Sequence, residues 1–334
     1  MSTPGPAVTS PAGRPGALPR PRWTVTLPLM LGSGTLVAVQ SQINGTLARQ
    51  LGTGLRAGAL AALISFGSGL VLLTVLALLH RPTRRGVAGL RTALARRQVP
   101  RWMVLGGLGG AFFVASQSLS APVLGVTFFI LCVVAGQAVM ALVVDHHGWG
   151  PSGVTALSRP RVAGAVLAVV AVGVSGAGLL TSVPVTALLL LVAALPLLAG
   201  AVSSVQQGVN GRLTAHVGSW VTTWNNFFIG TLGLAAFFGV ALLRPGHLAG
   251  LPSTPWLYLG GICGIGFIWA STVTVPVHGV LVVGVFNVAG QVLAAAVIGA
   301  VVGGRLGPTT VVAVVLSLAG AGVVGLAARR RQPA

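Results

Sequence analysis

The sequence predicts an all-α polytopic membrane protein of ten transmembrane helices, arranged as two five-helix repeats of inverted topology (5+5). Composition, long uncharged runs and an internal duplication together predict this class. The mean hydropathy is +0.94, and only 6% of the 334 residues are charged, whereas about a quarter are charged in soluble domains. So few charges cannot cover a water-exposed surface, and most of the chain is therefore expected to lie in lipid.

Ten apolar segments are long enough to cross a bilayer, which takes roughly 20 residues in a helix. Pro122 and Pro276 are expected at the first position of the fourth and ninth helices, where a missing N–H costs nothing. The ten helices are expected at residues 24–44, 57–79, 102–121, 123–144, 161–180, 185–206, 220–243, 256–275, 278–301 and 309–328.

Two repeats are expected between two tails. Residues 1–22 contain six prolines and no apolar run, so they are expected to form a disordered cytoplasmic tail. Residues 23–182 are expected to form the first five-helix repeat and residues 183–328 the second. Residues 329–334 form a basic tail, which is also expected in the cytoplasm.

The duplication is visible in an ordered series of matching motifs. The stretches "QSQINGTLARQLGT" from Gln40 and "QQGVNGRLTAHVGS" from Gln206 begin 166 residues apart. Further along, "LGGLGG" is followed by "LGGICG", and "AGQ" by a second "AGQ", each pair 154 residues apart. This order indicates a tandem duplication of a five-helix unit. Because five is odd, the two copies must cross the membrane in opposite orientations.

The arginines indicate which way the chain is oriented. With the N-terminus in the cytoplasm, cytoplasmic segments hold sixteen arginines and outer segments hold four. Positive residues are enriched on the cytoplasmic side of membranes, so both termini are expected there. The loop at residues 81–101 carries seven arginines, whereas its counterpart after the seventh helix carries only Arg244.

Several motifs together resemble one known family. They are the two "QxxxNGxL…G" stretches, "SFGSG" from Ser65, "LGGLGG", "AGQ" and "DHHGW" from Asp145. On these the chain resembles the YdcZ-type family of the drug/metabolite transporter superfamily over about residues 25–328. The resemblance implies a ten-helix inverted-repeat bundle with a central cavity that moves small metabolites or drugs. "DHHGW" has no counterpart in the second half, where residues 299–303 stand instead.

Seven amide side chains in or next to the predicted helices are the candidates for a substrate pathway. Glutamine and asparagine four residues apart share a helix face, and an amide in hydrocarbon must find polar partners. Two interpretations stay open: the amides cap helix ends and bridge helices, since Asn-Gly is also a turn signal, or they line a polar pathway. The inverted topology predicts an outer cluster of Gln40, Asn44, Asn287 and Gln291, and an inner cluster of Gln206, Asn210 and Gln137.

Glycines and one acid complete the candidate residues. The small-xxx-small pairs Gly106 with Gly110 and Gly260 with Gly264 are expected to allow close helix packing. Asp145 is the only acidic residue. It is a candidate for ion coupling, because acids within membranes are often functional. The alternative is an interfacial turn paired with Arg159 or Arg161.

Missing residue types exclude several function classes. The chain contains no Lys, so a phosphate-binding GxxxxGK loop is absent. One acid cannot form a carboxylate metal site, and neither a metal nor a cofactor is expected. The arginines, which give a net charge of +19, lie between and beyond the apolar runs. They favour anionic lipid headgroups over nucleic acid as the partner.

These observations predict a transporter of small metabolites or drugs in the plasma or inner membrane, working by alternating access and driven by a gradient rather than ATP. Export and uptake, and the small-molecule substrate itself, stay open, as does a homodimer. The alternative is a non-transporting membrane factor, such as a lipid-handling or scaffolding protein. A membrane enzyme is disfavoured, because no HExxH, CxxC or GxSxG motif is present.

Overall fold

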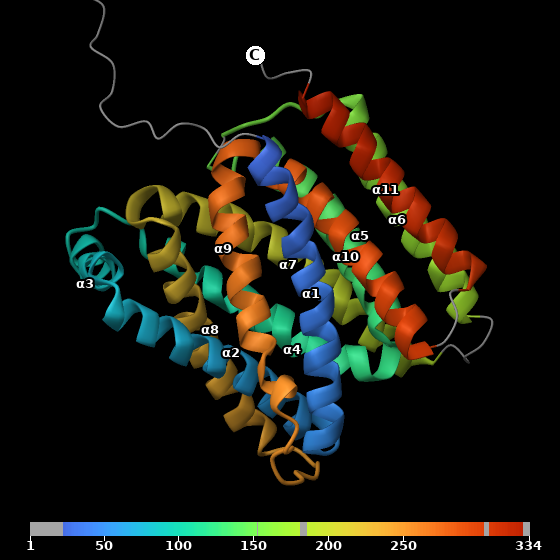
Figure 1. The fold of residues 1–334 in the computed structure, drawn as a ribbon, viewed down its shortest axis with the longest axis horizontal. Coiled ribbons are helices and arrows are strands. Elements are labelled where there is room, and N and C mark those ends of the chain that lie inside the picture. Colours follow the sequence, from blue (N-terminus) through green and yellow to red (C-terminus); the bar gives the residue numbers. More distant parts are fainter. Residues whose placement is uncertain (1–22, 152, 181–185, 304–306, 330–334) are drawn as a thin grey trace, which may run out of the picture.

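A computed structural model describes residues 23–151, 153–180, 186–303 and 307–329. The expected N-terminal tail, the expected C-terminal tail beyond Arg329 and the expected boundary between the repeats lie outside the described residues. Most of the described part is helical (Figure 1), and two short 3-10 helices, η1 (Arg101–Leu105) and η2 (Pro255–Tyr258), precede α4 and α9. Its helices are α1 (Trp23–Leu51), α2 (Gly54–Leu79), α3 (Arg81–Ala95), α4 (Gly106–Leu124), α5 (Val126–His146), α6 (Arg159–Leu180), α7 (Ala187–Val217), α8 (Ser219–Ala241), α9 (Gly260–His278), α10 (Val280–Gly303) and α11 (Pro308–Arg329).

The membrane class is confirmed by the length and composition of these helices. Among the described residues, eight helices are long and apolar enough to cross a bilayer. Helices α6 and α11 are not among the eight, and the apolar part of α11 covers only Val311–Ala327. They pack against each other at one edge of the molecule and also contact α5 and α10 (Figure 1). The expected count of ten spans therefore stays a prediction.

Helices from the first and second halves of the chain pack against each other at the centre. Helix α1 packs on α9 and α10, and α7 packs on α4 and α5. Small residues allow these close approaches, because a glycine lets two backbones touch. A Cβ on Gly34 of α1 would collide with the Asn287 carbonyl of α10, and a Cβ on Gly200 of α7 would collide with the Val133 carbonyl of α5. The two contacts occupy equivalent positions in the duplicated sequence.

The ends of four helices differ from the prediction. Pro122 and Pro276 lie inside the last turns of α4 and α9 instead of starting the next helices. The breaks follow at Gly125 and Gly279, where φ is 73° and 81°, a conformation that only glycine adopts without strain. The expected positions were therefore one helix too late. Each proline removes one backbone hydrogen bond in the last turn of its helix, and the helix ends two residues later.

Both Asn-Gly pairs lie inside helices, so the interpretation of these residues as helix ends was wrong. Helices α1 and α7 continue beyond them to Leu51 and Val217. Gly45 serves close packing: its Cβ would lie 3.3 Å from that of Ala121. The second glycine of each motif marks the true end, since Gly52 and Gly218 have φ of 136° and 81°.

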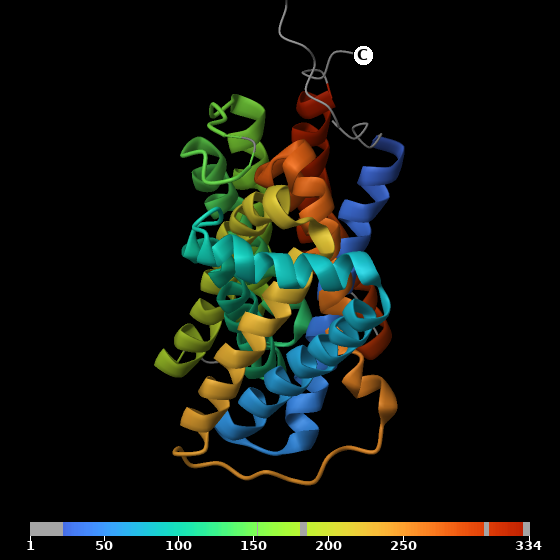
Figure 2. The same cartoon turned by 90° about the vertical axis from the view of Figure 1, so that its left-hand side faces the viewer.

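The arginine-rich segment expected as a loop contains a helix, α3. Its apolar side packs through Leu90 on a small cluster with Leu213 and Val221 at the junction of α7 and α8. Figure 2 shows α3 crossing in front of the other helices instead of running along them. An amphipathic helix with charges on one side and this orientation is typical of a helix at a membrane interface.

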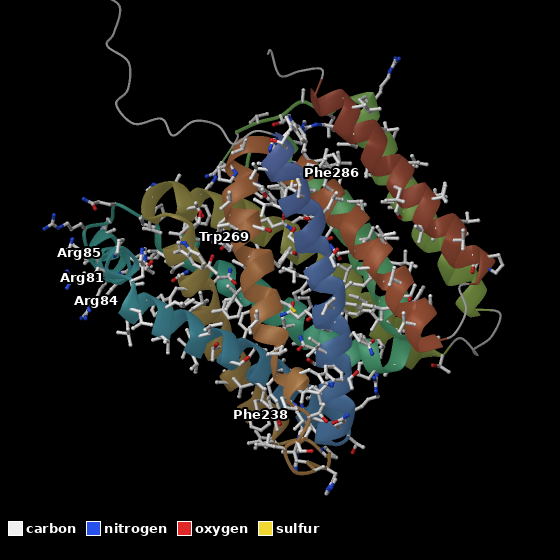
Figure 3. The ribbon with its side chains drawn as sticks, in the orientation of Figure 1. Arg81, Arg84, Arg85, Phe238, Trp269 and Phe286 are labelled. Atoms are coloured by element: carbon white, nitrogen blue, oxygen red, sulfur yellow. The ribbon has the colours of Figure 1, made fainter. Side chains whose placement is uncertain are left out.

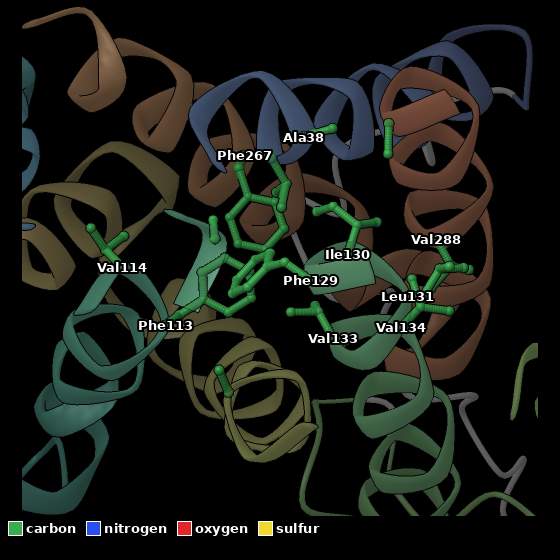
Figure 4. Close-up of a cluster of buried hydrophobic side chains, with 14 of the residues drawn as sticks. Ala38, Phe113, Val114, Phe129, Ile130, Leu131, Val133, Val134, Phe267 and Val288 are labelled. Atoms are coloured by element: carbon green, nitrogen blue, oxygen red, sulfur yellow. The ribbon is translucent and has the colours of Figure 1, made fainter. Parts of the chain in front are cut away.

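The largest apolar cluster fills the centre of the bundle. Phe113 of α4, Phe129 of α5 and Phe267 of α9 converge there (Figure 4). All three are at least 95% buried. This cluster holds together helices of both halves and adjoins the polar centre described next.

Candidate functional site

A small cavity at the centre is lined by five pairs of equivalent residues. Its volume is about 10 Å³, about enough for one water molecule. Each pair combines one residue from the first half with the residue at the matching position of the second half. The pairs are Gln40 with Gln206, Phe66 with Phe227, Gly110 with Gly264, Phe113 with Phe267, and Val114 with Ile268.

Stacked phenylalanines form two walls of this cavity. The rings of Phe66 and Phe227 are 4.6 Å apart between centroids with an interplanar angle of 23°. The rings of Phe113 and Phe267 are 6.5 Å apart at 19°. Both geometries are offset or parallel aromatic contacts of the kind that stabilises cores. Each wall therefore joins one helix of the first half to one helix of the second.

Gln40 and Gln206 close the cavity from two directions. Gln40 donates from Nε2 to the Gly260 carbonyl at 2.9 Å, whereas Gln206 donates to Oδ1 of Asn226 at 3.1 Å. A Cβ on Gly264 would lie 2.7 Å from the Gln40 amide nitrogen. Glycine at this position therefore makes room for the amide, and Gly110 does the same for Gln206 at 2.8 Å.

Asn44 and Asn210 of the two motifs differ in their hydrogen-bond partners. Asn44 donates to Oε1 of Gln117 at 2.8 Å, and Gln117 in turn donates to Ser41 at 2.9 Å. Asn210 lies against Gly106 in the way that Asn44 lies against Gly260. Within the described part of the chain, Oδ1 of both asparagines lacks a hydrogen-bond partner. A buried acceptor without a partner is costly, so these atoms are available to a polar group that enters the centre.

Gln137 and Gln291 are brought together, which contradicts their assignment to opposite clusters. Gln291 donates to Oε1 of Gln137 at 3.0 Å. The reason is their depth: each lies close to the middle of its helix, and inversion does not move a residue at mid-depth. Asn287 accepts from Gln291 and donates to Ser33 of α1 at 2.8 Å. The expected four-residue outer cluster is thus divided between two places.

Gln137 is also separate from the expected inner cluster. Its side-chain Nε2 donates to Ser203 of α7 at 3.5 Å, and its backbone carbonyl accepts from the Ser204 hydroxyl at 3.0 Å. Gln206 lies one turn further along α7 and is engaged with α8 instead. All seven predicted amide side chains are nevertheless buried, with at most 3% of their surface exposed.

Asp145 binds the start of a helix from the other half. Its two carboxylate oxygens accept from the backbone N–H groups of Val280 and Leu281 at 3.2 and 3.1 Å, at the first turn of α10. Arg161 lies 3.5 Å away. A carboxylate at a helix N-terminus is stabilised by unpaired N–H groups and the helix dipole. The pairing with Arg161 is one that the alternative interpretation named, and a role of Asp145 in ion coupling stays a prediction.

Sequence reasoning overlooked some residues at the centre. Gln117 lies two turns beyond Gly110 on α4, so a helical wheel starting at that glycine could have indicated it. Asn226 lies among other polar and aromatic residues of α8. The one sequence feature that distinguishes it is that it matches Ser65 of the first half. Phe113 and Phe267 match at the same spacing of 154 residues as the glycine motifs. This shared spacing could have identified the two phenylalanines from the sequence.

The fold and this centre define a multi-pass helical membrane protein built like a transporter, with polar amides buried where two sets of helices meet. The profile of a family described as "Putative inner membrane exporter, YdcZ" matches residues 25–174 and 191–324. The chain therefore belongs to this family, and the two matched regions are consistent with two fused units.

A comparison with solved structures shows that another protein has the same fold. A crystal structure of another protein superimposes with a TM-score of 0.62 and covers 93% of this chain and 98% of its own, at 18% identity. At this identity the likeness shows the fold alone. No curated protein matches the chain.

Proposed function

We propose that the protein exports or exchanges small metabolites or drugs by alternating access around the central cavity, driven by a gradient rather than by ATP. The observation that carries the proposal is the lining of that cavity by five pairs of equivalent residues. Transporters with inverted repeats place the substrate at the repeat interface near mid-membrane. The proposal assigns no catalysis to the chain.

The proposed architecture is ten spans in two inverted five-helix units, with α3 as an additional helix in the first. Equivalent contacts support it. Gly45 packs on Ala121, and at the matching positions Gly211 packs on Val275. The proposed orientation has both termini in the cytoplasm, and the excess of arginines in the corresponding segments supports it.

The structure has the central cavity nearly closed, so it represents an occluded state in this proposal. A small-molecule pocket requires about 300 Å³ or more, and the cavity holds about 10 Å³. Two contacts would have to open alternately: Gln40 with Gly260 on one side, and Gln206 with Asn226 on the other. In the proposed inverted arrangement the two contacts lie toward opposite faces of the membrane, so one can open while the other stays closed.

The cavity chemistry limits the substrate class. Two amides and four phenylalanine rings line it, so a partly apolar molecule with hydrogen-bonding groups fits best. The single acid, Asp145, is not among the lining residues. A neutral or zwitterionic substrate is therefore favoured, and an organic cation would rely on the aromatic faces alone.

A metabolite-accumulation comparison tests the proposal. Cells with and without the protein are compared by mass spectrometry, and the experiment is repeated with Gln40→Ala and Gln206→Ala at matched amounts of folded protein. We expect at least one compound to differ and each variant to remove the difference. Gln42→Ala is the matched control, since Gln42 is half-buried and bonds only Thr46 one turn away on α1.

Two outcomes would contradict the proposal. The first is that no compound differs although the protein is folded and present in the membrane. The second is that both variants transport as well as Gln42→Ala does. Either outcome would favour a non-transporting membrane factor, in which the amides only join helices.

A further inference from the structure

A second cavity, a groove larger than the central cavity, lies away from it at the end of α2. Its volume is about 310 Å³, and it is open to the surroundings of the protein. Three helices form it, with aliphatic residues from α2 on one side and two tryptophans from α8 on the other. The lining residues are Leu73, Leu76, Ala77, His80, Thr83, Trp220 and Trp224.

The walls are fixed by contacts with the rest of the bundle. Trp224 donates from its indole N–H to Thr74 at 3.2 Å and stacks on Phe228 at 5.1 Å. Trp220 lies against Trp269 of α9, with ring centroids 5.7 Å apart. His80 is held by Thr83 at 2.8 Å where α2 meets α3. The groove is therefore a preformed apolar surface with one polar end.

Arginines follow directly at that polar end. Arg81, Arg84 and Arg85 belong to the first turns of α3 and share one face, because residues three and four apart are neighbours on a helix. All three are exposed, and Figure 3 shows them together at the outer edge of α3. They lie next in sequence to His80 and Thr83 of the groove.

These arginines have no acidic side chain to pair with inside the protein. The sequence contains one acidic residue, Asp145, and its carboxylate already binds the start of α10 and Arg161. Their counter-charge must therefore come from outside. An apolar groove that ends in a cationic cluster beside an interfacial helix matches the shape and charge of an anionic phospholipid.

We propose that one anionic phospholipid binds here, with an acyl chain in the groove against Leu73, Leu76 and the two tryptophans and its phosphate on the α3 arginines. The site does not depend on transport. In the orientation proposed above it faces the inner leaflet. Arginine is suited to this role, because its planar guanidinium binds phosphate oxygens in pairs.

Native mass spectrometry of the full chain, released from nanodiscs of mixed phosphatidylglycerol and phosphatidylcholine, tests the proposal. We expect one phosphatidylglycerol to be retained in preference to phosphatidylcholine, and the triple variant R81Q/R84Q/R85Q to lower this preference by about five-fold or more. The matched control R91Q/R96Q/R101Q removes the same charge at positions that do not adjoin the groove, and it should keep the preference.

A second variant tests the groove itself. Thr83→Trp leaves every arginine in place but fills the groove, so it should also remove the retained lipid. Folding is checked for each variant by its melting temperature in phosphatidylcholine alone. Equal losses in both arginine triples would overturn the site in favour of diffuse attraction to the membrane surface. Retention by Thr83→Trp, or displacement of the lipid by inorganic phosphate alone, would also overturn it.

Discussion

Gln291 of α10 donates a hydrogen bond to Gln137 of α5 at 3.0 Å, although the two residues are 154 positions apart in the chain. They occupy matching positions in the duplicated sequence. A residue and its own counterpart can meet only where the two halves cross. This contact therefore joins α5 to α10 at matching positions of the duplicated sequence.

This hydrogen bond should contribute a measurable coupling energy. We expect a double-mutant cycle with Gln137→Ala and Gln291→Ala to give a coupling of about 0.6 kcal/mol and at most about 1.7 kcal/mol, the range for hydrogen bonds between membrane helices. The free energy of unfolding is measured by titration with SDS in mixed micelles. Pairing Gln137→Ala with Gln42→Ala is the control, and these two changes should be additive. A zero coupling energy for the glutamine pair would contradict the contact.

The packing glycines should be sensitive to a single methyl group. A Cβ on Gly260 would lie 2.6 Å from Oδ1 of Asn44 and 2.7 Å from the Ser65 hydroxyl. We expect Gly260→Ala to lower the free energy of unfolding by about 1–3 kcal/mol, because overpacking forces neighbours to shift. Gly67→Ala is the matched control, since a Cβ there meets nothing within 4 Å. Equal stability of the two variants would show that α9 has room to move.

Asp145 should matter more for stability than for coupling. Asp145→Ala would leave the mostly buried Arg161 and two backbone N–H groups without their acceptor. We expect a loss of about 3 kcal/mol or more in the free energy of unfolding. Asp145→Asn keeps one acceptor oxygen and should lose less. Transport per folded molecule should then survive in Asp145→Asn, and complete loss of transport at normal stability would identify Asp145 as a coupling residue.

The class of the fold was accessible from the sequence because it depends on composition and repetition. Hydropathy gives the membrane helices, and motifs such as "LGGLGG" reveal the duplication without any structural knowledge. The helix ends were harder to predict from the sequence. Asn44-Gly45 is a turn signal in water, but in this bundle the helix continues, because the glycine packs on Ala121 and hydrocarbon leaves backbone groups no other partner.

The amides of the candidate site could be named, but their partners could not. Four-residue spacing shows that Gln40 and Asn44 share a helix face. It does not show that Gln40 reaches a backbone carbonyl of α9, because that depends on how deeply α1 packs against α9. Helix α3 was also not predicted, because the seven arginines of residues 81–101, four of them in α3, indicated only a charged loop.

Alternating access is tested most directly by thiol labelling of the two motif glutamines from each side of the membrane. Cys132 and Cys263 are both free and buried, and their replacement by Ala gives a background for Gln40→Cys and Gln206→Cys. Both glutamines are nearly inaccessible here, at 2% and 3% exposure, so labelling requires opening. We expect an impermeant thiol reagent to label position 40 faster from outside and position 206 faster from the cytoplasm. Faster labelling of both positions from the same side would contradict the proposed inverted arrangement and, with it, the proposed alternating access.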